Sequence, residues 1–365
     1  MRCVTRDAPT RRVSRQLRDV FALCAVALTA LLGCGRERGA DNAAVGGNGA
    51  ASGVGGGASG AGESSGGAAT GPQLLYDLGT ARAVALEADE QYLYWAEAGP
   101  FRITRAPKSG AGPSEELGPW AGGELTKSMF AVDQTAVYWL DDSVVRKRNK
   151  ADGALSTIEI GRPPVEGGWF MTADSDYLYV ADRDANQVVR VAKSGGELQP
   201  YTTTPRPTSS GSYLAVDSDS LYVGNNRDLL RFPKQGGAAT TLAQVKSGEM
   251  FGAVVSDDRD VYWANNREIL ATREENLAML PKAGGAIADL GVIGDGTAIM
   301  RLDTSKGRLY WTTKGGTSRD RVLTFSLADA KLDVMSMGQP IYGGMAQDER
   351  YVYWCGETSV MRLAK

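Results

Sequence analysis

The chain has no histidine among its 365 residues. This absence excludes Ser-His-Asp and Cys-His nucleophile systems, histidine-ligated zinc and an imidazole general base. Any enzymatic reaction would have to use carboxylates, lysine, tyrosine or a hard cation such as calcium. The sequence also lacks a phosphate-binding glycine loop, a cysteine pair at metal-ligand spacing and a sialidase-type Asp box. We therefore expect no enzymatic activity.

Cysteine is scarce, and the chain has no excess of positive charge. Of the four cysteines, Cys3 and Cys24 lie in a predicted export segment and Cys34 is a predicted lipid attachment site. Only Cys355 remains as a free thiol, which excludes an intrachain disulfide. We expect it to be a small buried side chain, with a reactive thiol as the alternative. The formal net charge of −3 and the lack of a long basic run argue against nucleic-acid binding.

The apolar run Val20–Gly33 is too short to span a membrane comfortably, which takes roughly 20 residues. Arginines precede it and small residues end it, as in a secretory signal peptide, which we assign to residues 1–33. The sequence Leu31-Leu32-Gly33-Cys34 resembles a bacterial lipobox, which implies acylation of Cys34. An ordinary signal peptide and a membrane-retained helix are the alternatives. Because Gly35 is not the Asp of inner-membrane retention, the resemblance implies an outer-membrane lipoprotein.

Residues 34–71 follow as a predicted tether. Fourteen of the 37 residues from 35 to 71 are glycine, and none is aromatic. Such a segment cannot bury enough apolar area to offset its conformational entropy. We expect it to be flexible, so that the lipid is the only membrane contact of residues 72–365.

From residue 72 onward, one pattern recurs seven times at spacings of 40–48 residues. Each repeat has an anchor dipeptide that begins with tyrosine, and in six repeats an aspartate stands five positions before that tyrosine. The anchors are Tyr94-Trp95, Tyr138-Trp139, Tyr179-Val180, Tyr222-Val223, Tyr262-Trp263, Tyr310-Trp311 and Tyr353-Trp354. A lysine and a glycine turn follow further along most repeats, as in Lys193-Ser194-Gly195-Gly196.

A period near 43 residues without a helical pattern is typical of four-stranded propeller blades. The anchor strands lack polar alternation, as expected where both faces of a sheet are buried. We expect each aspartate to cap a turn and each glycine pair to supply positive φ. The last repeat ends at Lys365 without an outermost strand, and a spare strand-like segment, 73–79, precedes the first repeat. The sequence thus predicts an all-β, seven-bladed propeller over 72–365, closed by its N-terminal strand.

The repeat resembles the Tyr-Trp-Thr-Asp class of propeller repeats found in low-density-lipoprotein receptors, and the related TolB-like bacterial propellers. Tyr310-Trp311-Thr312-Thr313 and Tyr138-Trp139-Leu140-Asp141 are the most similar copies. The resemblance covers residues 73–365. It implies the fold and leaves function open, since propellers host unrelated activities.

Two groups of residues are candidates for a site. The residue at the third position after the anchor tyrosine is polar in most repeats. A ring of such residues could coordinate calcium, which is the only cofactor that the sequence suggests. The weak metal candidates are Glu97, Asp141, Asp182, Asn225 and Asn265. Alternatively, these residues only stabilise turns. Aromatic residues in the variable loops form a candidate binding rim, with blade-gap packing as the alternative. They are Trp120, Trp169, Phe170, Phe251 and Tyr342.

We predict a non-catalytic binding or scaffolding module of the cell envelope that recognises a protein, peptide or glycan. The alternative is a calcium-dependent hydrolase or lyase with an ion in the central channel. A spacer without a small ligand is a third reading.

Overall fold

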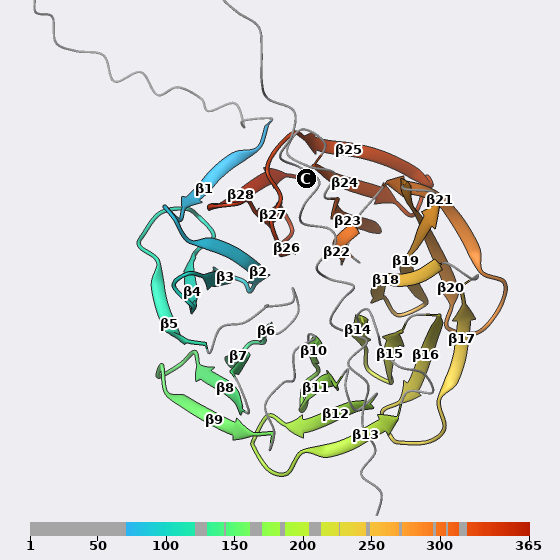
Figure 1. Cartoon of the computed structure of the whole chain (residues 1–365), viewed down its shortest axis with the longest axis horizontal. Coiled ribbons are helices and arrows are strands. Elements are labelled where there is room, and N and C mark those ends of the chain that lie inside the picture. The colour runs from blue at the N-terminus through green and yellow to red at the C-terminus, as the bar shows by residue number, and fades with distance from the viewer. Residues whose placement is uncertain are drawn as a thin grey trace, which may run out of the picture. The chain divides into compact units, whose positions relative to one another are not determined.

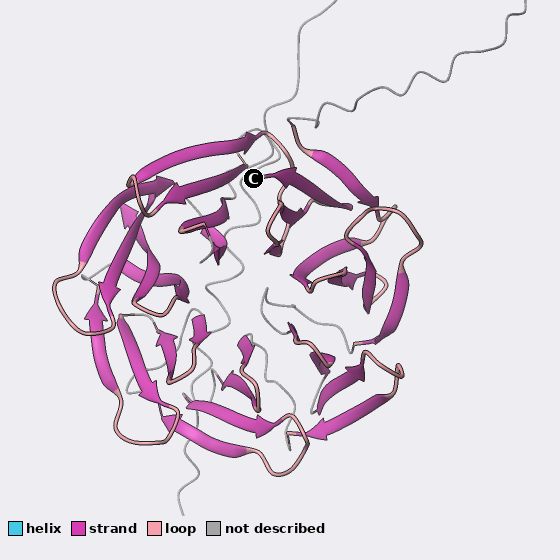
Figure 2. Cartoon of the chain, turned by 180° about the vertical axis from the view of Figure 1, so that it is seen from behind, coloured by secondary structure: helices cyan, strands magenta, loops and turns pink. Residues whose placement is uncertain are grey.

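The computed structural model describes residues 71–120, 130–141, 144–160, 170–182, 187–203, 213–225, 227–245, 249–269, 272–294, 297–303, 306–313 and 320–365. All of them belong to one of two compact units of the chain, Ser65–Lys365. None of these residues is helical, and Figure 2 shows strands joined by loops throughout. In this part of the chain, therefore, no helix has the length and apolarity needed to cross a membrane.

Seven antiparallel sheets of four strands form a ring, which confirms the predicted seven-bladed propeller (Figure 1). We number the sheets as blades 1 to 7, and give the strands of each from the axis outward. Blade 1 contains β2 (Arg82–Ala88), β3 (Tyr92–Ala98), β4 (Arg102–Pro107) and β5 (Glu115–Pro119), and blade 2 contains β6 (Phe130–Val132), β7 (Ala136–Asp141), β8 (Val144–Asn149) and β9 (Leu155–Glu159). Blade 3 contains β10 (Phe170–Ala173), β11 (Tyr177–Asp182), β12 (Gln187–Ala192) and β13 (Gln199–Thr203), and blade 4 contains β14 (Tyr213–Val216), β15 (Ser220–Gly224), β16 (Asp228–Pro233) and β17 (Thr240–Gln244).

The remaining blades follow the same order, except at the end of the ring. Blade 5 contains β18 (Glu249–Ser256), β19 (Asp260–Ile269), β20 (Thr272–Pro281) and β21 (Ala288–Gly294), and blade 6 contains β22 (Thr297–Asp303), β23 (Arg308–Thr313), β24 (Arg321–Ser326) and β25 (Lys331–Met337). Blade 7 contains β26 (Met345–Gln347), β27 (Tyr351–Cys355) and β28 (Ser359–Ala364), with β1 (Gln73–Asp77) as its outermost strand.

The N-terminal strand closes the ring as predicted. β1 pairs antiparallel with β28, so that Gln73 lies opposite Arg362 and Asp77 opposite Ser359. Tyr76 extends this closure to blade 1, because its hydroxyl donates to the carbonyl of Pro107 at 2.5 Å. The pairing removes the strand edge that blade 7 would otherwise expose.

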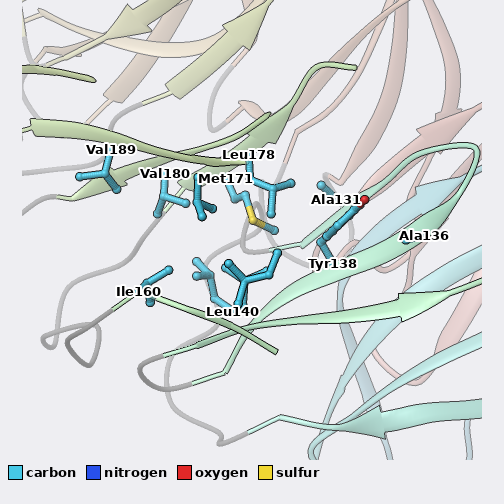
Figure 3. Close-up of a cluster of buried hydrophobic side chains, with 12 residues drawn as sticks. Ala131, Ala136, Tyr138, Leu140, Ile160, Met171, Leu178, Val180 and Val189 are labelled. Atoms are coloured by element: carbon cyan, nitrogen blue, oxygen red, sulfur yellow. The ribbon is translucent and has the colours of Figure 1, made fainter. Parts of the chain in front are cut away.

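The anchor dipeptides form the core between blades. Their tyrosine and tryptophan side chains are at most 2% exposed, which accounts for the missing polar alternation. Between blades 2 and 3, for example, Tyr138 and Leu140 of β7 belong to the same buried cluster as Leu178 and Val180 of β11 (Figure 3). Burial of large aromatic side chains at each interface supplies the main apolar contribution to stability.

The aspartate before each anchor caps the turn between the first and second strands of its blade. In blade 1, Asp89 Oδ1 accepts the backbone N–H groups of Gln91 at 2.8 Å and Tyr92 at 2.7 Å. The glycine pairs adopt the expected positive φ, for example 95° at Gly195 and 126° at Gly196. We call the side of the ring that carries the capped turns the Asp-turn face.

Each of six blade interfaces is bridged on this face by an ion pair, which we call a Lys–Asp joint. A lysine that follows the third strand of one blade donates through Nζ to the Oδ2 atom of the capping aspartate of the preceding blade. The pairs are Lys108–Asp348 (2.8 Å), Lys150–Asp89 (2.6 Å), Lys193–Asp133 (2.6 Å), Lys234–Asp174 (2.7 Å), Lys282–Asp217 and Lys365–Asp303 (2.5 Å). Sequence analysis assigned the lysine to a turn and the aspartate to a cap, and did not connect the two.

The joints hold their carboxyl groups ionised. Burial alone would raise the pKa of Asp348, but hydrogen bonds from Lys108, two backbone N–H groups and the Tyr353 hydroxyl lower it to about 2. The same balance lowers the pKa of the aspartates in four other joints, Asp89, Asp133, Asp174 and Asp217. A carboxyl group with a lower pKa in the folded state stabilises the fold only while it is ionised.

We therefore predict that acid opens the ring. Each such aspartate should contribute about 1–2 kcal/mol above roughly pH 4, and this contribution should vanish as the pH falls toward about 2. Urea unfolding followed between pH 7 and pH 2 measures the effect, and Asp348→Asn should remove about one proton from its pH dependence. A free energy of unfolding that stays constant from pH 5 to pH 2 would show that the joints do not behave in this way.

Candidate functional site

The predicted polar ring includes two carboxylates that are already paired within their blades. Glu97 is buried and accepts hydrogen bonds from Arg102 Nε at 2.7 Å, Trp95 Nε1 at 2.8 Å and Thr104 Oγ1 at 2.9 Å. Asp141 accepts from Arg146 Nε at 2.5 Å. Both carboxylates therefore serve local contacts at the ends of β3 and β7.

The other ring positions differ from one another. Asn225 caps a turn, since its Oδ1 accepts the backbone N–H of Asp228 at 2.8 Å. Its Nδ2, the Oδ1 of Asn265 and the Oγ1 of Thr313 are buried and have no hydrogen-bond partner among the described residues. Asp182 ends β11, but its side chain lies outside what the structure describes.

These residues do not assemble into a metal site in the described ranges. No three histidine, cysteine, aspartate or glutamate side chains there lie close enough together to hold an ion. Arginine contacts also compete for the carboxylates of Glu97 and Asp141. The carboxylates of Glu97 and Asp141 are thus already paired with arginine, and the calcium site stays a prediction.

The aromatic residues of the predicted rim are placed in different ways. Trp120 is 6% exposed, donates through Nε1 to the Glu97 carbonyl at 3.0 Å and packs between blades 1 and 2. Phe251 is 3% exposed and packs in the cluster between blades 4 and 5. Tyr342 is half-buried beneath Arg82, whose guanidinium carbon lies 5.4 Å from the ring centre. Trp169 and the side chain of Phe170 lie outside the described residues.

The structure describes only one of the two cysteines that the sequence singles out. Cys34 lies outside the described residues. Cys355 is completely buried in blade 7, and this burial raises the pKa of its thiol. The thiol therefore matches the predicted small core side chain rather than a reactive group.

Two clefts flank blade 1 on the Asp-turn face. One, of about 800 Å³, lies toward blade 2 and is lined by Asp89, Tyr94 and Lys150 among others. The second, of about 900 Å³, lies toward blade 7 and is lined by Asp89, Lys108 and Asp348 among others. Both fall in the size range of small-molecule sites.

Between these clefts and the axis lies an ion pair that joins two innermost strands. The Arg301 Nη2 atom on β22 lies 2.6 Å from the Glu87 Oε1 atom on β2. These strands belong to blades 6 and 1, with blade 7 between them (Figure 1). The pair therefore spans the width of blade 7 at the level of the innermost strands.

Glu87 differs electrostatically from the other acidic groups. Burial raises its pKa, and the nearby Arg301 guanidinium only partly opposes this rise. Among the described carboxyl groups with a shifted pKa, Glu87 is the one whose pKa is raised. A carboxylate of raised basicity next to a fixed cation is an arrangement suited to proton transfer.

This pair was not predicted from the sequence, although the repeat contains a signal for it. Glu87 and Arg301 stand two positions before the capping aspartate of their blades. The equivalent residues in the other five blades are uncharged: Ala131, Thr172, Ala215, Val255 and Ala346. Opposite charges at this one repeat position, in blades 1 and 6, could have identified a contact across the channel.

Comparisons with known proteins identify the architecture. No protein-family model matches the chain, and no curated protein sequence matches it. Virginiamycin B lyase from Staphylococcus aureus has a similar structure, with a TM-score of 0.63 at 12% identity over 80% of this chain and 99% of the lyase. Oligogalacturonate lyase in complex with manganese gives a TM-score of 0.58 at 9% identity, over 80% of this chain and 92% of that one.

A third similar structure is the extracellular domain of a putative one-component system from B. thetaiotaomicron. Its TM-score is 0.58 at 12% identity, over 80% of this chain and 40% of that chain. At such low sequence identity, these structural similarities show only that the fold is shared.

The comparisons correct one prediction of the sequence analysis. A non-catalytic binding or scaffolding module, with no enzymatic activity, was expected because the usual catalytic motifs are missing. Instead, propellers similar to this one include two kinds of lyase, which contradicts the expectation of a non-catalytic module. The alternative, a hydrolase or lyase, agrees better with the comparisons.

Proposed function

We propose that this chain is a propeller lyase whose reaction takes place at the channel mouth on the Asp-turn face. The observation that carries the proposal is the Glu87–Arg301 pair, with its 2.6 Å contact and the raised pKa of Glu87. The similar folds of two lyases support the same class of reaction.

A lyase of this kind removes a proton from a carbon next to a carbonyl or carboxylate group, and a β-substituent then leaves. The Glu87 carboxylate accepts that proton, and the C–H electron pair forms the new double bond. The bond to the leaving oxygen breaks at the same time, and that oxygen keeps the electron pair and takes a proton from water. Arg301 stabilises the negative charge that develops on the carbonyl or carboxylate oxygen of the substrate as the proton is removed. The raised pKa makes Glu87 a stronger base at neutral pH.

The missing histidine gives Glu87 its importance in this scheme. A virginiamycin B lyase in which one histidine is replaced by alanine is described as catalytically inactive. This chain has no histidine, so it requires another proton acceptor. We assign no step to a metal, because the described carboxylates do not gather around a common point.

We predict that Glu87→Gln abolishes turnover while the ring remains folded. Oligogalacturonate and quinupristin serve as probes, and the new double bond is followed by ultraviolet absorbance and mass spectrometry. Loss of the proton acceptor should lower kcat by about 100-fold or more. Glu159→Gln is the matched control, since Glu159 is exposed on the outermost strand of blade 2, lines neither cleft and should retain full activity.

Two results would contradict the proposal. If Glu87→Gln turned over a probe as fast as the unmodified chain, Glu87 would not be the base. If neither probe were converted by the unmodified chain, these two substrate classes and the lyase assignment with them would be withdrawn. Circular dichroism of each variant checks that the fold is retained.

We further propose that the enzyme is exported and held by a lipid on Cys34 at the outer membrane. The arginines before Val20, the apolar run and the Leu-Leu-Gly-Cys sequence support this location. One similar solved structure is an extracellular domain. The anchor motifs support kinship with Tyr-Trp-Thr-Asp or TolB-like propellers. A glycan or peptide of the envelope is the class of partner that suits this location.

For the lipid anchor we predict that Cys34→Ser shifts the protein from the membrane fraction to the soluble fraction. The unmodified chain should also incorporate radiolabelled palmitate in bacterial cells, and the variant should not. Cys24→Ser, ten residues earlier in the apolar run, is the control and should behave like the unmodified chain. Equal labelling of the Cys34→Ser variant would rule out this anchor.

A further inference from the structure

The interface between blades 5 and 6 lacks the lysine that completes a Lys–Asp joint. Leu327 stands where the other blades have that lysine. Its backbone N–H donates to the Gly307 carbonyl at 2.9 Å, just as that of Lys150 donates to Thr135 at 2.9 Å and that of Lys193 to Asp176 at 2.8 Å. The main chain therefore keeps the geometry of a joint, and only the ammonium group is missing.

The acceptor side of this joint is complete. Asp257 Oδ1 accepts the backbone N–H groups of Arg259 at 2.8 Å and Asp260 at 2.7 Å, which forms the usual capped turn. The Tyr262 hydroxyl donates to Asp257 Oδ2 at 3.1 Å. Oδ2 is the atom that receives lysine in the six other joints, but within the described ranges no cation pairs with Asp257.

A cleft of about 360 Å³ opens at this position. Asp257, Asp260, Tyr262 and the exposed Arg259 supply its polar wall, in which the two carboxylates outnumber the single guanidinium. Aliphatic and aromatic side chains form the other wall: Met279, Leu290, Phe325 and Leu327. The cleft thus combines an anionic end with an apolar wall.

The six complete joints show which chemical group this cleft accommodates. In four of them the lysine ammonium also lies near the ring of the anchor tyrosine, at 5.0 Å for Lys150 and Tyr94 and 4.7 Å for Lys365 and Tyr310. Carboxylate and aromatic face together favour a cation. Tyr262 and Asp257 offer the same two groups without an internal lysine.

We propose that this cleft binds a primary ammonium group on an aliphatic chain, as found in a lysine side chain or a free alkylamine. The ammonium donates to Asp257 Oδ2 and lies against Tyr262, while its methylene groups pack on Leu327 and Phe325. The cleft lies between blades 5 and 6 and shares no lining residue with the Glu87–Arg301 pair, so it does not depend on the proposed lyase activity.

The test titrates the purified full-length chain with n-butylammonium and with Nα-acetyl-lysine N-methylamide, followed by saturation-transfer NMR. The ion pair together with burial of the alkyl chain predicts dissociation constants on the order of 1 mM. Asp257→Asn keeps the turn-capping oxygen and should weaken binding at least tenfold. Leu327→Lys should fill the site, abolish binding and raise the unfolding midpoint by roughly 2 °C. Leu332→Lys adds the same charge at an exposed position of blade 6 and should change neither quantity.

The two probes also distinguish a lysine side chain from a free alkylamine as the source of the ammonium group. Preferential binding of the lysine derivative indicates a protein or peptide partner, whereas preferential binding of butylammonium indicates a free amine. Binding that persists unchanged in both Asp257→Asn and Leu327→Lys would overturn the proposal. The proposal would also be overturned if neither probe bound at a concentration of about 20 times the expected dissociation constant of about 1 mM.

Discussion

The contact on which the ring depends is the Lys–Asp joint, repeated at six of the seven blade interfaces. In each joint, the capping aspartate uses one oxygen to fix the turn of its own blade and the other to bind the next blade. Tyrosine hydroxyls add to this in several blades, for example Tyr94 to Asp89 at 2.6 Å. Local turn geometry and ring assembly are thus coupled through a single side chain. Between the joints, buried anchor residues supply the apolar contacts.

Both proposed sites lie where blades depart from the shared pattern. Charges at the repeat position of Glu87 and Arg301 create a contact across the channel that the uncharged residues of other blades cannot form. Leucine in place of lysine at Leu327 leaves an acceptor without its donor. A repeat protein can change such positions without altering the strands, because each blade is held by its own hydrogen bonds and by its neighbours.

The sequence predicted the fold well because the repeat reports directly on burial and turn geometry. Anchor spacing, the aspartate cap, the glycine turns and the N-terminal closing strand all follow from contacts within a blade or with the adjacent one. The Glu87–Arg301 pair skips a blade, and its side chains are more than two hundred residues apart in the chain, so local patterning does not connect them. Trp120 and Phe251, read as a rim from their loop positions, are buried because each packs against the next blade.

The most direct measurement of the central claim is a double-mutant cycle on one joint, Lys193 with Asp133, using Lys193→Met and Asp133→Asn. Both side chains are largely buried, at 10% and 22% exposure. Urea unfolding of the unmodified chain, both single variants and the double variant should give a coupling free energy of about 1.5–3 kcal/mol. A coupling below about 0.5 kcal/mol would show that the joint behaves as an ordinary surface pair and that apolar packing alone holds the blades together.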